Sequence, residues 1–141
     1  MLPELMLVGF AAWTLLLLLA TVGVYRFSRV FGGRAGMGDF PAVGVDGKPW
    51  YVRAMRAHAN CIENLPVFAV LVYALRACGV EHAAVDPLCA ATLAARIAQS
   101  LVHVSLVQTD RVVSVRFAFY FVQFVCFAAL IALIVPAVLR H

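Results

Sequence analysis

The sequence predicts an all-α integral membrane protein, a four-helix up-and-down bundle whose single transmembrane domain covers residues 1–141. Three observations predict this class: the composition, four long apolar runs and the short connections between most of them. Of the 141 residues, 65% are hydrophobic and 13% are charged, whereas a soluble domain has roughly 45–50% apolar and about 25% charged residues. The mean hydropathy is +0.96.

Each predicted helix follows from one apolar run, since a helix that crosses a bilayer needs about 20 mainly apolar residues. The first run carries no charge, the second begins with a polar cluster, the third is interrupted by three polar side chains, and the fourth has only Gln123 as a strongly polar residue after position 116. The four helices are expected at roughly 5–25, 57–76, 85–107 and 113–139.

The connections differ in length and composition. Residues 26–55 contain many glycines and prolines, which predicts one long loop. The other two connections are short, so neighbouring helices are expected to run antiparallel.

Arginine and lysine predict the orientation in the membrane. The first and third connections, with their flanks, carry most of these residues, while the opposite side has only Arg76 and Arg140. Because basic flanks stay in the cytoplasm, the long loop should be cytoplasmic and both termini should lie on the other side. The acidic start of the chain, at Glu4, is unlike a signal peptide. A compact multi-pass chain of this kind fits a bacterial inner membrane.

Several functional classes are disfavoured. The net charge of +4 does not come from a basic run interleaved with aromatic residues, so nucleic acid is not an expected partner. The four cysteines lie in apolar stretches without a C-x-x-C pair, which argues against a zinc site or a disulfide framework. No metal is expected.

Polar side chains mark one face of the second predicted helix. Arg53, Arg56, Asn60 and Glu63 are spaced by three, four and three residues and therefore share a face; we call them the second-span stripe. Snorkelling at the interface accounts for the two arginines, but Glu63 lies roughly 10 Å deeper than Arg56. Polar groups inside a membrane are costly unless they are partnered, so the stripe indicates a functional site or a buried ion pair.

The third and fourth helices repeat this pattern. Arg96, Gln99 and His103 are spaced by three and four residues; we call them the third-span stripe. Arg96 lies near the middle of its helix, where the expected partner of its guanidinium is the carboxylate of Glu63 or of a ligand. Arg116 and Tyr120 then share a face of the fourth helix, either as a basic flank with an interfacial tyrosine or as part of a pocket.

Taken together, the candidate residues favour an anionic ligand. One carboxylate, Glu63, stands among several arginines, and arginine forks bind carboxylates bidentately. The chain has no H-E-x-x-H sequence and no serine beside a base, so neither a metal site nor a covalent triad is indicated.

The run Arg56-x-x-x-Asn60-x-x-Glu63-x-x-Pro66 resembles the signature of the MAPEG superfamily, the membrane-associated proteins in eicosanoid and glutathione metabolism. Further matches are Arg96, Arg116 and Tyr120. The resemblance covers essentially the whole chain. It implies a homotrimer that binds glutathione as a co-substrate between neighbouring subunits, near the cytoplasmic face, with no metal.

The resemblance also implies roles for individual residues. Arg116 would be the catalytic arginine beside the sulfur; the tyrosine four residues later favours it over Arg111. The implied glutathione-binding residues are Arg53, Arg56, His58, Asn60, Glu63, Arg96, Gln99, His103 and Tyr120. One arginine near the end of the first helix also belongs to this site, and it is Arg26, Arg29 or Arg34.

The activity implied by the resemblance is that of a membrane-bound glutathione transferase, or a glutathione-dependent peroxidase, in detoxification. A free thiol has a pKa of about 8.5, and an adjacent cation lowers the pKa of an acid by about 1–3 units. The resulting thiolate would attack a lipophilic electrophile or hydroperoxide that enters from the lipid. Two alternatives are a non-catalytic relative that binds lipid or protein, and a small transporter subunit that uses Glu63 and Arg96 as a charge relay.

Overall fold

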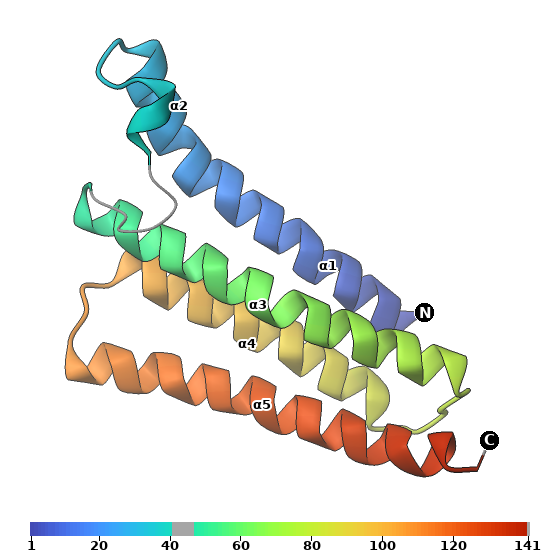
Figure 1. Cartoon of the computed structure of the whole chain (residues 1–141). Helices are drawn as coiled ribbons and strands as arrows, with labels where there is room; N and C mark the ends of the chain where they lie inside the picture. The colour runs from blue at the N-terminus through green and yellow to red at the C-terminus, as the bar shows by residue number, and fades with distance from the viewer. Residues whose placement is uncertain (41–46, 141) are drawn as a thin grey trace.

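The computed structural model describes residues 1–40 and 47–140. In this part of the chain the regular structure is entirely helical, and four helices are long and apolar enough to cross a membrane. Figure 1 shows that they run up and down in chain order and that both termini lie at the same end of the molecule. We refer to these helices as the first to fourth spans.

The first span is longer than predicted from the sequence. Its parts are α1 (Leu2–Leu17), a π-helical segment η1 (Leu18–Gly23) and α2 (Val24–Phe31). The expected helix, 5–25, was too short because hydropathy marks residues that suit lipid, whereas the backbone hydrogen bonds continue beyond them. The span ends at Phe31 and is capped by Gly32, and Gly33 follows with φ of 63°, a left-handed conformation that glycine adopts without a steric penalty.

The second span, α3 (Pro49–Ala77), also begins earlier than the predicted range of 57–76. Pro49 occupies the first helical position, where its fixed φ suits the helix and its missing N–H is no loss. The connection predicted at 26–55 is therefore too long: its two ends are helical, and the described part between them holds a short 3-10 turn, η2 (Met37–Asp39). The remaining predicted loop positions, 41–46, lie outside the described residues.

The third and fourth spans are α4 (Val85–Ser105) and α5 (Asp110–Val138). The first of these ends two residues before the predicted position 107, and the second begins three residues before the predicted position 113. The early start has a local cause. Thr109 caps α5, because its side-chain oxygen accepts a hydrogen bond from the backbone N–H of Val112 at 3.3 Å, and such caps satisfy a donor that the first helical turn leaves free.

The helix α4 is the centre of the packing. It contacts α1, α3 and α5, and Figure 1 shows α1 and α5 on opposite sides of the α3–α4 pair. Side chains from all four spans meet in the core, where Phe10, Phe68, Cys89 and Leu130 are fully buried. As a consequence, most of the surface of α4 faces other helices, while α1, α3 and α5 each keep an outward face.

Candidate functional site

The second-span stripe lies on an outward face of α3. Arg56 and Glu63 are exposed in the single chain, whereas Arg53 and Asn60 are partly buried. Arg53 is the member that reaches a neighbouring helix, because its Nε donates a hydrogen bond to the carbonyl oxygen of Val104 at 3.3 Å. The stripe is therefore anchored to α4 at one end and open along the rest of its length.

The third-span stripe is buried. Arg96, Gln99 and His103 have exposed fractions of 0%, 5% and 3%. Beside them on α4, Ser100 contacts Cys61 of α3 through Oγ and Sγ at 3.5 Å. This stripe forms a buried polar seam between helices.

Arg96 is surrounded by protein but is not hydrogen-bonded. Within the described residues none of its three guanidinium nitrogens has a hydrogen-bond partner. The group lies 5.6 Å from the ring centroid of Phe10, at a distance where a cation–π attraction is effective.

Of the two partners expected for Arg96, the carboxylate of Glu63 or that of a ligand, Glu63 forms no ion pair with it in the single chain. In the described part of the chain the ion pairs join Glu4 to the N-terminal amine and to Arg76. The carboxylate of Glu63 still acts electrostatically on Arg96 from a longer distance. Glu63 is exposed, whereas Arg96 lies inside the core.

The fourth span adds Arg116 and Tyr120 to the same region. Arg116 is partly buried and Tyr120 is 45% exposed. The charges of Arg53, Arg56 and Arg116 all act on the ring of His103. Side chains from α3, α4 and α5 thus converge near the end of the bundle opposite the termini.

His58 and the arginines of the first span are placed differently. His58 is partly buried and lies about 200° around the helix from Arg56, since each residue turns an α-helix by about 100°. Of the three candidate arginines, Arg26 and Arg29 lie in the first span and Arg34 lies beyond its end. The side chain of Arg26 bonds to α3, because its Nε donates to the hydroxyl oxygen of Tyr51 at 2.9 Å. Arg29 contacts Tyr25 of its own helix at 3.4 Å.

Gln123 is a site residue that sequence reasoning missed. It is 1% exposed, and its Nε2 donates to Oε1 of Gln99 at 3.1 Å. The available signal was that it is the only strongly polar residue in the apolar part of the fourth span, but its spacing from other polar residues did not place it on a recognisable stripe.

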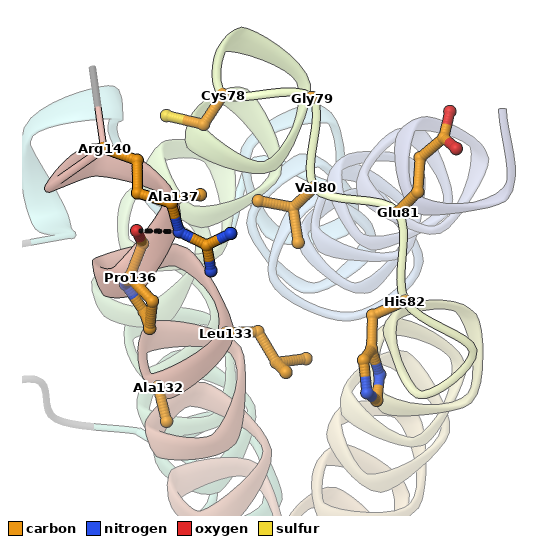
Figure 2. Close-up of a pocket in the computed structure, with 10 residues that line it drawn as sticks. All are labelled: Cys78, Gly79, Val80, Glu81, His82, Ala132, Leu133, Pro136, Ala137 and Arg140. Carbon is orange, nitrogen blue, oxygen red and sulfur yellow. Dashed lines mark hydrogen bonds between the residues drawn. The ribbon is translucent and has the colours of Figure 1, made fainter.

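A hollow of about 460 Å³ lies at the opposite end of the bundle (Figure 2). It is formed by the connection between α3 and α4 and by the last turns of α5, and it contains none of the predicted site residues. At its edge Arg140 bonds to its own helix, with Nε donating to the carbonyl oxygen of Pro136 at 3.1 Å. Of the candidate residues, Arg56, Glu63 and Tyr120 lie on open faces of the chain instead, while the third-span stripe is buried.

Within residues 1–40 and 47–140 no three histidine, cysteine, aspartate or glutamate side chains are grouped closely enough to hold a metal ion. The site is therefore built from arginines, amides, one histidine and one carboxylate. Such a set can bind an anion that also carries a positive group, and it can stabilise a negative charge that forms on that ligand.

The comparisons with known proteins give one match. The sequence model of the MAPEG family matches residues 5–136, nearly the whole chain. Searches of curated proteins and of solved structures returned no match. The chain belongs to the MAPEG family, and it is a multi-pass integral membrane protein.

Proposed function

We propose that this MAPEG protein is a membrane-bound glutathione transferase or glutathione-dependent peroxidase of detoxification. The observation that carries the proposal is the convergence of Arg53, Arg56 and Arg116, none of which forms an ion pair within the described residues. Arginines on helices that cross a membrane are costly without an anionic partner. Glutathione, with two carboxylates, supplies that partner.

The second-span stripe fits the charges of the peptide. Arginine binds a carboxylate through two parallel hydrogen bonds, so Arg56 is suited to one carboxylate of glutathione. Glu63, two helical turns along the same face, is suited to the ammonium group. Asn60 lies between them and can donate to or accept from the peptide bonds.

In this proposal Arg116 acts on the sulfur of glutathione. A cation beside a thiol favours the thiolate, typically lowering the pKa of an acid by about 1–3 units. The thiolate attacks a lipophilic electrophile, a carbon–sulfur bond forms, and the leaving group or the added proton balances the charge. With a hydroperoxide, the thiolate takes one oxygen and an alcohol leaves; a second glutathione then converts the sulfenic acid to the disulfide and water.

The exposed face of α3 supports a homotrimer. Beyond the charged part of the stripe, the same face continues with Val67, Val70 and Tyr73, which are also exposed. Lipid can cover the apolar half of this face but not the charged half. A neighbouring subunit together with bound glutathione covers both halves, and the open sides of α1 and α5 leave access for an electrophile dissolved in the bilayer.

Glutathione binding to the purified protein tests the proposal, with the ultraviolet absorbance of the thiolate as a second signal. Arg116→Ala should lower turnover about 10- to 1000-fold, which corresponds to a thiolate titration about 1–3 units higher. Its effect on glutathione affinity should be small, because the cation acts on the sulfur only after the proton has left.

Arg111→Ala is the matched control, since Arg111 is an exposed residue on the first turn of the same helix. It should leave the thiolate titration unchanged. If the thiolate titration shifts in Arg111→Ala and does not shift in Arg116→Ala, the catalytic arginine is Arg111 and the assignment to Arg116 is wrong. An unchanged titration in both variants would remove the arginine mechanism, and a protein that binds no glutathione would favour a lipid- or protein-binding role.

Native mass spectrometry in a mild detergent tests the assembly. A trimer is expected, with the active site on the cytoplasmic side as the distribution of arginine and lysine indicates. A protein that is purely monomeric while it binds glutathione would contradict the assembly.

A further inference from the structure

The part of α5 that carries Arg116 and Tyr120 has little core packing of its own. The buried residues of this helix begin at Gln123 and continue with Cys126, Phe127, Leu130 and Ile134. From Asp110 to Val122 every side chain is exposed or only partly buried. Apolar burial is what normally fixes a helix to its neighbours, so polar contacts have a larger part in positioning this segment.

A chain of side-chain amides supplies such contacts. Gln123 donates from Nε2 to Oε1 of Gln99 at 3.1 Å and to the carbonyl oxygen of Phe119 at 3.0 Å. Gln99 in turn donates from Nε2 to the carbonyl oxygen of Arg116 at 3.2 Å. Both carbonyl groups belong to the helical turn from Arg116 to Tyr120.

The direction of this chain follows from chemistry. Backbone carbonyl oxygens only accept hydrogen bonds, so each must face an NH₂ group rather than an amide oxygen. Phe119 therefore fixes the orientation of Gln123, whose second hydrogen points to the oxygen of Gln99. Because the oxygen of Gln99 faces Gln123, its NH₂ group faces the carbonyl oxygen of Arg116. The orientation of each amide thus determines that of the other.

We propose that Gln123 and Gln99 act as positioning residues that hold the Arg116–Tyr120 turn against α4. The inference rests on the proposed function and deepens it, because it assigns a role to Gln123 and changes the role expected for Gln99. The amide of Gln99 bonds within the protein, to the helix that carries the catalytic arginine, rather than to glutathione. The pair sets the position of the Arg116 guanidinium relative to the sulfur.

Gln123→Leu keeps a side chain of similar size and removes the amide. The expected result is turnover reduced about 10- to 100-fold, since a displacement of about 1 Å at a reacting group has effects of this order. Glutathione affinity should stay within about twofold, and the thiolate titration should move to higher pH by up to about one unit. Gln99→Leu should give the same pattern, and the double variant should be no worse than either single variant, because the two residues act as one unit.

Thr92→Val is the matched control. Thr92 is fully buried on α4, but its hydroxyl bonds only to the carbonyl oxygen of Leu88 in its own helix, at 2.9 Å. It should leave turnover and titration unchanged. If Gln99→Leu weakens glutathione binding and Gln123→Leu does not, Gln99 contacts the ligand and the positioning role is overturned.

Hydrogen exchange followed by mass spectrometry separates this inference from the proposed function. In the assembled full-length protein, amides of residues 110–122 should exchange faster in Gln123→Leu than in the unmodified protein or in Thr92→Val. If the exchange rates of these amides are the same in Gln123→Leu as in the unmodified protein, the two glutamines do not anchor the helix, whatever the activity of the variant. If exchange is faster but turnover and the thiolate titration are unchanged, the two glutamines anchor the helix without positioning Arg116 for catalysis. If the unmodified protein binds no glutathione, the proposed function fails, and exchange alone decides whether the amides anchor the helix.

Discussion

The second-span stripe on α3 and the third-span stripe on α4 have the same helical spacing and opposite surroundings. Arg56 and Glu63 of the first are exposed, while Arg96 and His103 of the second are almost completely buried. The cause is the position of each helix: both contact the other three spans, but α4 is the more deeply buried of the two, whereas α3 keeps one face outside the bundle. Equal spacing thus has two outcomes, an outward-facing polar surface on α3 and an internal polar seam on α4.

This difference predicts how changes in each region should behave. A substitution around the buried seam should alter the stability of the protein, because it changes packing or leaves polar groups unpaired. A substitution in the exposed stripe should alter ligand binding with little change in stability. The three variants below test this division, from the largest expected effect to the smallest.

Phe10→Ala should have the largest effect. The ring is fully buried, packs against Phe68 with centroids 5.9 Å apart, and lies beside the Arg96 guanidinium. Its removal leaves a cavity and should lower the free energy of unfolding by about 3–5 kcal/mol. Thermal unfolding in a mild detergent measures this. The control is Leu15→Ala, at a position that is 59% exposed on the same helix. It should change the free energy of unfolding by about 0.5 kcal/mol or less. An equal loss of stability in both variants would contradict a core centred on the buried seam.

Glu63→Gln should change binding and leave stability nearly unchanged. The carboxylate is exposed and forms no ion pair within the described residues, so its loss should cost little in the unliganded protein. Loss of one charge-assisted hydrogen bond to the ligand should cost about 1.5–3 kcal/mol, or roughly 10- to 150-fold in glutathione affinity. Calorimetry on the assembled protein measures the change.

The control for this variant is Glu81→Gln, which removes an exposed carboxylate from the connection at the opposite end of the bundle. It should leave glutathione affinity unchanged. Unaltered affinity in Glu63→Gln, in a protein that folds and assembles, would remove Glu63 from the site. A large loss of stability would place it instead in an ion pair with Arg96.

Ser100→Ala should have the smallest effect. The hydroxyl donates to the carbonyl oxygen of Arg96 at 2.8 Å and contacts the Cys61 sulfur, so its removal eliminates one buried contact between α3 and α4. A typical intramolecular hydrogen bond contributes about 0.5–1.5 kcal/mol, and thermal unfolding should show a decrease of this size. Glutathione affinity should not change; a clear loss of affinity would show that the seam also contacts the ligand.

The sequence by itself determined the membrane class and the number of spans, because a run of about 20 apolar residues has few roles other than crossing a bilayer. It also determined which residues share a helical face, since helix geometry fixes that spacing. It did not determine the helix ends at Phe31 and Pro49, because hydropathy reports the part of a helix suited to lipid while caps and glycines decide where the backbone stops.

The tertiary structure decided what each polar face meets. Spacing along α4 could not reveal that Arg96 lies against Phe10 instead of pairing with Glu63, because that depends on which helices surround α4. It also could not reveal the bonds from Gln123 through Gln99 to Arg116, since these join residues 17 and 24 positions apart in the chain. Local spacing fixes a direction around one helix, whereas the partner found in that direction depends on how separate helices pack.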